Sequence, residues 1–327
     1  MERATYVRQA SEELGIPVKL LADMQGAKIR LGGFEGGEAQ LTKGKTFRID
    51  LDIDQEGDSK RVGMPHPELL EQLEVGHELI FDDGNFNMHV SEVGGGFVNA
   101  VASKNYVLKS RKGITAPDVR IDGASFTSKD RKDGDFALDV IGVDIIVQSF
   151  VDNAENVDVF ADFVAGRAKR MTKVETKLAL EDIDNIIVAS DSVMVGRGDL
   201  GVAIGKPKLP NAQRGIVSRC RAAKTYVVVA TGMAEAGGSA GETTDVSQAV
   251  YQMRKENGTP PVDGAAMLSA EVAAGDDPVG AVKFMCETIV ESELYCIDPE
   301  RALTSLFGKA AQSWNEKNEP VSHYVFD

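Results

Sequence analysis

The stretch that decides the fold reads MTKVETK from Met171 and SVMVGRGDLG from Ser192. Each of its two apolar runs ends in a charged cluster. Lys173 and Glu175 lie two residues apart on an extended segment, so their side chains face the same side. Asp199 follows the second run after a Gly-Arg-Gly turn. One ammonium and two carboxylates at the ends of neighbouring buried strands can hold a divalent metal and an anionic substrate together, although surface ion pairs at two strand ends would give the same pattern.

The composition indicates a folded protein with one large domain or two smaller ones, because the chain has 327 residues and 43% of them are hydrophobic. The formal net charge of -15 disfavours nucleic acid or an anionic membrane as a partner. Anionic small molecules stay possible, because a local basic pocket can form inside an acidic protein. No apolar run approaches the roughly 20 residues that a membrane helix needs, so no membrane partner is expected.

Cysteine and histidine usage bears on the compartment and on the chemistry. The three cysteines, Cys220, Cys286 and Cys296, are widely spaced and odd in number, which indicates free thiols in a reducing compartment. The N-terminus has no apolar core typical of a signal peptide, so we expect a cytoplasmic protein. The four histidines are scattered, which argues against a zinc site and against histidine acid–base chemistry.

The first third of the chain changes character at residue 27. A helix is expected over 3–14 and a strand over 17–22, which ends at Asp23 before a glycine. Residues 27–118 then carry glycine pairs, short alternating stretches and an Asp-Asp-Gly turn. This pattern is typical of a small all-β insert.

After the insert, strands and helices alternate. We expect the following segments: helix 128–141, strand 143–150, helix 153–170, strand 171–175, helix 177–185, strand 192–196, helix 208–223, strand 226–231, helix 243–255, strand 265–269 and helices 277–294 and 299–317. The alternation indicates an α/β fold, either a barrel or a doubly wound sheet. Six strands are found outside the insert, whereas a closed (β/α)8 barrel needs eight.

The glycines between Gly196 and Gly201 formally match G-x-G-x-x-G. No helix is expected directly after them, and no acidic residue lies about 20 positions on, so a dinucleotide fold is not favoured.

Six motifs are specific enough to resemble a known family. They are LLADMQGAKIR at 20–30, KSRKGITAP at 109–117, TKVE at 172–175, VMVGRGDLGV at 193–202, VATGM at 229–233 and MLSAEVAAG at 267–275. In this order they resemble pyruvate kinase over roughly residues 1–295. The resemblance implies a (β/α)8 TIM barrel with a β-barrel domain inserted after a strand, as well as a homo-oligomer.

With the resemblance, the domains are expected as a first barrel part over 1–26, an inserted β-barrel domain over 27–118, a second barrel part over 119–298, and a C-terminal helix and tail over 299–327. The barrel is expected to be incomplete, with six strands. Counterparts of the family's first two barrel strands and of its C-terminal domain are not found.

The resemblance implies a glycolytic kinase that transfers a phosphoryl group between phosphoenolpyruvate and ADP, giving pyruvate and ATP. Such a reaction needs positioning and charge neutralisation more than a nucleophile. Glu175 and Asp199 would bind Mg²⁺ or Mn²⁺, and Lys173 would stabilise the developing enolate. Thr231 would help to place the substrate carboxylate and the proton donor, and Gly198 would let that carboxylate approach closely.

Further roles follow from the same resemblance. Arg30 and Lys112 would bind nucleotide or phosphoryl charge. Asp23 and Met24 match the family's monovalent-cation site. Lys28 occupies a place where many potassium-dependent members have glutamate, and its ammonium would substitute for K⁺. Potassium itself is therefore left open.

Other interpretations remain beside these roles. Arg30 could be an ordinary exposed arginine, Lys112 part of a solvated basic hinge, and Thr231 simply the end of a strand. The family's Thr-Gln-Met is Thr231-Gly232-Met233 here, its interface arginine is Ala240, and residues 251–262 carry an extra stretch. Two alternative functions therefore stay open: a non-catalytic relative that binds Mg²⁺ and a phosphorylated acid, and a related barrel lyase or aldolase acting on 2-keto acids.

Overall fold

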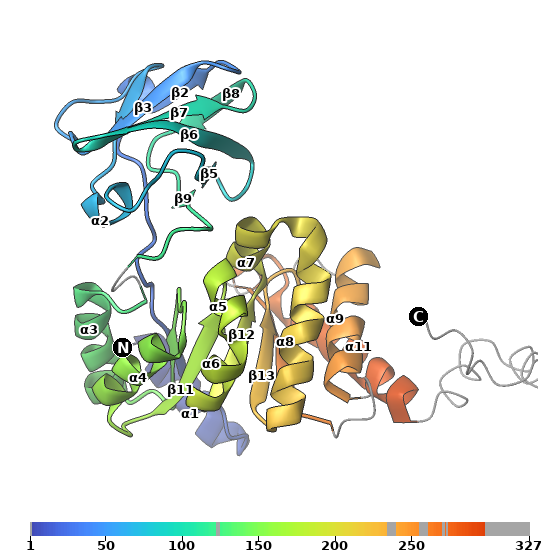
Figure 1. Ribbon diagram of the computed structural model, residues 1–327. Helices are drawn as coiled ribbons and strands as arrows, with labels where there is room; N and C mark the ends of the chain where they lie inside the picture. The colour runs from blue at the N-terminus through green and yellow to red at the C-terminus, as the bar shows by residue number, and fades with distance from the viewer. Residues whose placement is uncertain are drawn as a thin grey trace, which may run out of the picture. The chain divides into compact units, whose positions relative to one another are not determined.

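The computed structural model describes residues 2–121, 125–233, 240–254, 261–269, 272 and 274–297. It divides into two compact units, Met1–Val228 and Val229–Asp327. Figure 1 shows the helices and strands of both.

The first unit contains four parallel strands that are neighbours in one sheet. In order across the sheet they are β1 (Leu21–Asp23), β10 (Ile145–Gln148), β11 (Lys169–Val174) and β12 (Ser192–Gly196). Asp23 is in register with Val147, and Lys173 with Met194. Because parallel strands end at the same edge, the residues that end β1, β11 and β12 meet along one rim of the sheet.

Helices connect these strands in the alternating pattern of an α/β fold (Figure 1). They are α3 (Ser128–Asp135), the π-helix η2 (Phe136–Ile141), α4 (Ala154–Val164), α5 (Lys177–Glu181), α6 (Ile183–Ala189), α7 (Arg197–Ile204), the short η3 (Lys206–Lys208) and α8 (Leu209–Ala223). All five residues of β12 are buried, as expected for a parallel strand that is covered on both faces. The alternation confirms the predicted α/β class.

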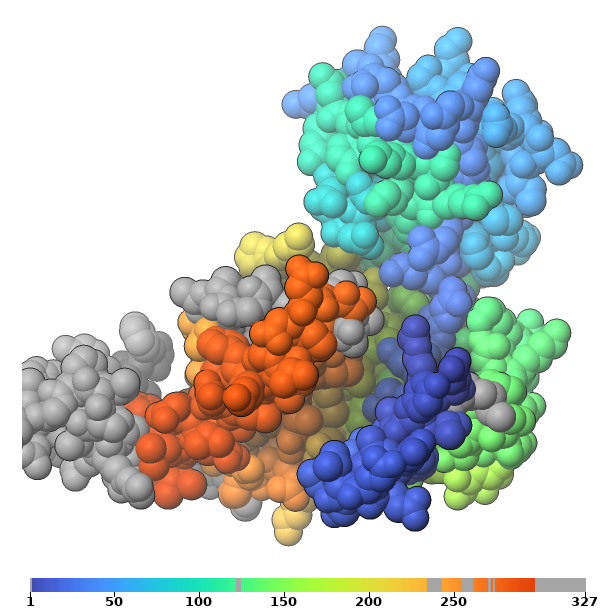
Figure 2. Space-filling view, turned by 180° about the vertical axis from the view of Figure 1, so that it is seen from behind, coloured from blue at the N-terminus to red at the C-terminus, as the bar shows by residue number. Residues whose placement is uncertain are grey.

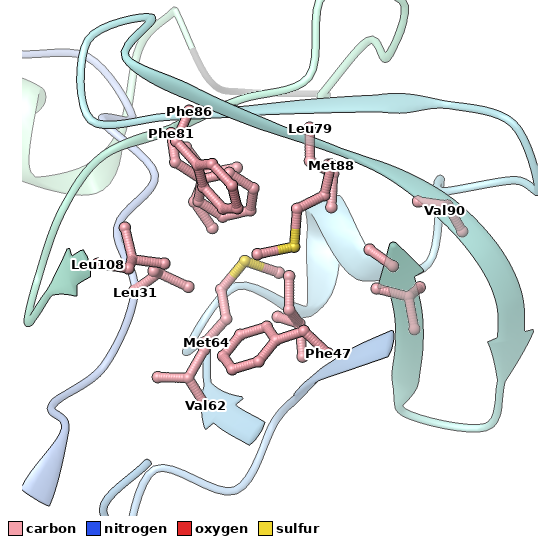
Figure 3. Close-up of a cluster of buried hydrophobic side chains, with 14 of the residues drawn as sticks. Leu31, Phe47, Val62, Met64, Leu79, Phe81, Phe86, Met88, Val90 and Leu108 are labelled. Carbon is pink, nitrogen blue, oxygen red and sulfur yellow. The ribbon is translucent and has the colours of Figure 1, made fainter. Parts of the chain in front are cut away.

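The insert between β1 and α3 is built almost entirely of strands. They are β2 (Glu38–Leu41), β3 (Thr46–Asp50), β4 (Arg61–Gly63), β5 (Glu78–Phe81), β6 (Phe86–Gly94), β7 (Phe97–Ala102), β8 (Tyr106–Lys109) and β9 (Ile114–Thr115), with the short helices η1 (Glu35–Gly37) and α2 (Pro67–Leu70). Six of them form a sheet in the order β4-β3-β7-β6-β5-β9, while β2 pairs with β8. Figure 3 shows the core, in which Phe47, Met64, Phe81 and Met88 are almost fully buried. The insert therefore has a small hydrophobic core of its own.

The second unit contains α9 (Ala240–Arg254), β14 (Gly264–Met267) and α11 (Pro278–Ile297). The strand β13 (Tyr226–Ala230) crosses the division between the units. The two long helices are joined by an ion pair between Arg254 Nη2 and Glu293 Oε1 at 2.6 Å. The helix predicted over 299–317 lies outside the described residues. Within the described part of the chain, the strands outside the insert number six, as the sequence predicts.

The helix that follows β10, α4, ends earlier than the sequence predicted, so this prediction is corrected. The expected helix 153–170 stops at Val164, because Ala165 takes a left-handed φ of +50° and Gly166 follows at +77°. Lys169 and Arg170 belong instead to β11. The guanidinium of Arg170 pairs with Asp191 at 3.2 Å and that of Arg167 with Asp139 at 2.9 Å, so these two arginines are engaged by tertiary ion pairs rather than by the helix dipole.

Two further boundaries differ from the prediction. A helix does follow β12 directly, since α7 begins at Arg197, within the glycine-rich stretch that was expected to be a turn. Glycine has a low helix propensity, but Asp199 in the first turn is favoured there by the helix dipole. The first strand covers only Leu21–Asp23, instead of the expected 17–22.

The N-terminal helix α1 (Glu2–Leu14) lies on the surface of the first unit, and none of its residues is buried (Figure 2). Arg8 holds it through an ion pair of 2.7 Å with Asp144, which precedes β10. Of the helices in the described residues, none combines the length and the apolar character that a bilayer crossing requires.

Candidate active site

The ammonium of Lys173 lies between two carboxylates at the rim of the parallel sheet. Lys173 is the penultimate residue of β11, and its Nζ is 2.9 Å from Asp23 Oδ2 at the end of β1. The same Nζ is 3.8 Å from Glu175 Oε2. Burial alone would lower the pKa of Lys173, but Glu175, Asp23 and Asp199 together raise it above its usual value. The side chain is therefore a fixed positive charge at neutral pH.

Glu175 is the most buried charged group of this cluster, with only 3% of its surface exposed. It follows the last residue of β11, and its Oε1 accepts a hydrogen bond of 2.9 Å from the backbone N–H of Phe150. Phe150 adopts a left-handed φ of +52°, which is uncommon for an aromatic residue. Gly196 makes room on the other side, because a Cβ there would lie 2.9 Å from Glu175 Oε2. Backbone conformation thus fixes the carboxylate from two directions.

The environment of Glu175 changes its acidity. Burial raises the pKa of the Glu175 carboxyl, the positive charge of Lys173 lowers it, and the negative charge of Asp199 raises it. The resulting pKa is about 7. Its negative charge is thus only partly compensated within the protein. The arrangement fits a site in which a further cation completes the charge balance.

Asp199 stands in the first turn of α7, and its Oδ1 is 3.8 Å from Lys28 Nζ. Lys28, Glu175 and Asp199 line one cavity of about 90 Å³. Asp152 lines it as well, and burial raises the pKa of that carboxyl despite a hydrogen bond with Thr176 and the charge of Arg120. The cavity therefore brings together carboxylates and the ammonium groups of Lys28 and Lys177, from the insert, the strand ends and the helices α5 and α7.

Oxygen atoms gather beside Asp23. Ser149 Oγ lies 2.6 Å from the backbone oxygen of Met24 and 3.2 Å from Asp23 Oδ1. A hydroxyl has one proton and can donate it to only one of the two acceptors at a time. The Met24 side chain itself packs in the core with Phe126 and Phe160. Of the atoms of Met24, the backbone oxygen and not the side-chain sulfur is therefore placed to act as a ligand.

The donor set fits a divalent metal held by few protein atoms. In the described ranges, no group of three or more histidine, cysteine, aspartate or glutamate side chains could hold a metal ion. Glu175 and Asp199 line one cavity as a pair of carboxylates. Mg²⁺ is commonly bound by one or two carboxylates, with water and substrate phosphates supplying the other ligands. The structural observation that favours a cation here is the buried Glu175 carboxylate, whose oxygen lies 3.8 Å from the Lys173 ammonium.

Arg30 and Lys112 make their described contacts within the insert. Lys112 Nζ lies 2.5 Å from Asp82 Oδ1, and this partner raises the pKa of Lys112. The hydroxyl of Tyr106 donates to the other oxygen of Asp82. Arg30 Nη1 donates to the backbone oxygen of Arg111 at 3.1 Å. Arg30 and Lys112, which the sequence analysis assigned together to nucleotide binding, thus contact different partners in the structure.

The remaining expected residues lie at element boundaries. Gly198 is exposed in the first turn of α7. Thr231 follows β13 in the second unit and has a left-handed φ of +76°. Ala240 is the first residue of α9. Part of the extra stretch at 251–262, residues 255–260, lies outside the described residues.

Sequence reasoning missed Ser149, Phe150 and Gly196. All three act through short-range geometry: a hydroxyl next to Asp23, a main-chain N–H on Glu175, and a missing Cβ beside Lys173 and Glu175. A Ser-Phe pair directly after a buried strand was the available signal, but it does not specify a backbone angle.

Comparisons with known proteins agree with the motifs. The family described as pyruvate kinase, barrel domain, matches residues 1–282. A pyruvate kinase of Methylorubrum extorquens is 38% identical over 302 residues, which are 90% of this chain and 61% of the relative. Pyruvate kinase II of Salmonella typhimurium is 35% identical over 303 residues, 89% of this chain and 61% of the relative.

A solved structure supports the same relationship. The crystal structure of a pyruvate kinase from Cryptosporidium parvum superposes with a TM-score of 0.81 at 29% sequence identity. The match covers 94% of this chain and 62% of that chain. The chain spans about three fifths of the length of the curated relatives that it matches.

Proposed function

The chain belongs to the pyruvate kinase family, and on that premise we propose that it transfers a phosphoryl group between phosphoenolpyruvate and ADP, giving pyruvate and ATP. The observation that carries the proposal is the ammonium of Lys173, held 2.9 Å from Asp23 and beside the buried Glu175. Phosphoryl transfer is catalysed mainly by positioning and by neutralising developing charge. A lysine kept protonated at the rim of a parallel sheet supplies both.

Lys173 lies beside the transferring phosphoryl group and stabilises the enolate that forms when the phosphoryl group leaves. Its two carboxylate neighbours keep it charged and fix its position. Thr231 helps to orient the substrate carboxylate and the proton donor that converts the enolate to pyruvate. Gly198, without a Cβ, leaves room for that carboxylate at the start of α7.

Glu175 and Asp199 are the residues that would hold Mg²⁺ or Mn²⁺. When bound there, the metal would supply positive charge that offsets the phosphate charge. Asp23 and the Met24 backbone oxygen would serve a monovalent cation. Lys28 brings an ammonium to Asp199 and supports the alternative in which K⁺ is not required.

Arg30 and Lys112 would bind the nucleotide phosphates. Because Lys112 is paired with Asp82, nucleotide binding through Lys112 requires exchange of that carboxylate for a phosphate oxygen. We also propose that residues 27–118 act as one inserted domain, flanked by barrel parts at 1–26 and 119–298 and followed by a tail at 299–327. We further propose that the protein works in glycolysis, as a homo-oligomer in the cytoplasm.

The test is a coupled assay of pyruvate release from phosphoenolpyruvate and ADP with Mg²⁺, with and without K⁺. Lys173→Met should lower turnover by about a thousandfold, whereas the exposed Lys132→Met, as a matched lysine control, should leave it unchanged. Turnover without K⁺ would support Lys28 as the cation substitute. Mg²⁺-dependent binding of phosphoenolpyruvate without any turnover would overturn the kinase proposal and favour a non-catalytic relative.

A further inference from the structure

Ser149 follows the strand that lies between the two partners of the ion pair at the rim of the sheet. That strand, β10, is flanked by β1, which ends at Asp23, and by β11, which carries Lys173. Ser149 is almost fully buried, with 1% of its surface exposed. Its hydroxyl is 3.2 Å from Asp23 Oδ1, and the other oxygen of this carboxylate, Oδ2, is 2.9 Å from Lys173 Nζ. One carboxylate thus connects a buried hydroxyl to the ammonium.

Packing does not fix the direction of the Asp23 carboxylate. The side chain is 42% exposed, whereas that of Lys173 is 16% exposed. An exposed aspartate rotates about both of its side-chain torsions unless a contact holds it. The buried hydroxyl of Ser149 is a donor with a fixed position on the protein side of the carboxylate. A hydrogen bond from this hydroxyl therefore keeps Oδ2 turned toward Lys173.

The backbone beside Asp23 is held without Ser149. The N–H of Met24 donates to a carbonyl oxygen of β10 at 3.0 Å, which continues the ladder between β1 and β10. The N–H of Gly26 donates to Oδ1 of the fully buried Asp130 at 3.1 Å. The hydroxyl of Ser149 also reaches the Met24 oxygen, at 2.6 Å, but that oxygen belongs to a segment already fixed on both sides. What the hydroxyl adds is a contact that holds the Asp23 side chain.

We propose that Ser149 is a positioning residue for Lys173: its hydroxyl donates to Asp23 and so holds the carboxylate against the ammonium. A hydrogen bond to a charged acceptor is stronger than one to a neutral oxygen, which favours donation to Asp23, whereas the shorter distance favours Met24. That Lys173 takes part in phosphoryl transfer rests on the proposed function. The chain of contacts from hydroxyl to carboxylate to ammonium does not.

The test combines Ser149→Ala with Asp23→Ala in the full chain and measures how firmly Lys173 is held. Acetic anhydride acylates an amine that has left its carboxylate partners, and peptide mass spectrometry gives the labelling rate of Lys173 relative to the exposed Lys132. Ser149→Ala should raise this relative rate by about threefold to tenfold, as expected for one lost hydrogen bond. With Asp23→Ala already present, Ser149→Ala should change the rate no further, because both substitutions remove the same contact.

Turnover gives a second measurement. In the coupled assay Ser149→Ala should lower kcat by about tenfold and leave KM for phosphoenolpyruvate within about twofold, and it should lower kcat no further in Asp23→Ala. Ser59→Ala changes an exposed serine of the insert and should leave both labelling and kcat unchanged. If far-UV circular dichroism shows that Ser149→Ala does not fold, Ser149→Cys takes its place, because a thiol fills the site and donates only weakly.

The outcomes separate this inference from the proposed function. Faster labelling of Lys173 that disappears in Asp23→Ala supports the inference even if the chain shows no turnover. Unchanged labelling in Ser149→Ala would overturn it. Equal acceleration with and without the Asp23 carboxylate would overturn it as well, because Ser149 would then act through the Met24 oxygen. Turnover with the same kcat in Ser149→Ala and the parent would leave the kinase proposal standing and remove the positioning role.

Discussion

Replacing Glu175 by glutamine should make the metal-free protein more stable at alkaline pH while weakening Mg²⁺ binding. The carboxyl is 3% exposed, and its pKa is raised from 4.5 to about 7. Glutamine keeps an oxygen that can accept from the Phe150 N–H, so the contact at 2.9 Å is preserved. What the substitution removes is the cost of ionising a buried group.

The sign and size of the effect follow from the two pKa values. Between about pH 4.5 and 7 the unfolded chain has lost the Glu175 proton while the native state retains it, so native stability falls as pH rises and levels off above 7. One pKa unit corresponds to about 1.4 kcal/mol, so the native state loses about 3 kcal/mol across this window. Glutamine does not titrate and avoids that loss.

The measurement is urea unfolding followed by far-UV circular dichroism, without metal, at about pH 4.5 and about pH 8. The free energy of unfolding of Glu175→Gln relative to the parent should increase by about 3 kcal/mol from the lower to the higher pH. Glu38→Gln, an exposed carboxylate of the insert, controls for the loss of one charge. A difference that is the same at both pH values would refute the reasoning about Glu175.

Three further outcomes follow from the site and its supports. Lys173→Met should reduce pyruvate release by about a thousandfold in a variant whose far-UV circular dichroism spectrum shows that it is still folded. Gly196→Ala places a Cβ 2.9 Å from a Glu175 oxygen and should lower kcat by about tenfold to a hundredfold; wild-type kinetics would contradict this close approach. Thr127→Ala removes the capping box that Thr127 shares with Asp130 and should cost about 1 kcal/mol in urea unfolding, an effect that Thr127→Ser should largely avoid.

The strand ends were predictable because apolar runs that end in charged residues can be recognised in the sequence. The buried runs before Glu175 and Asp199 predicted neighbouring parallel strands, and the β-rich composition after residue 26 predicted the insert. Local rules failed where tertiary pairing decides. Arg170 looked like the basic end of a helix, but it belongs to β11 and pairs with Asp191. The glycines between Gly196 and Gly201 kept the start of α7 from being recognised as a helix in the sequence, although Asp199 lies in its first turn.

The site was harder to predict than the sheet, because part of it is backbone. The motif resemblance pointed to side chains such as Lys112, yet only the structure shows the carboxylate of Asp82 beside it. The left-handed angle of Arg111 depends on hydrogen bonds to residues some 80 positions away, including Arg30. Sequence spacing does not encode such a contact.

The N–H of Phe150 that binds Glu175 belongs to the main chain, so side-chain substitutions leave the donor in place, and only proline deletes it. In a mutational scan, tolerance at this position should therefore follow backbone preference instead of side-chain chemistry. Glycine and asparagine, which accept a left-handed φ, should rank highest, and valine and isoleucine lowest. A position of this kind can vary widely among descendants of one gene while performing an unchanged task.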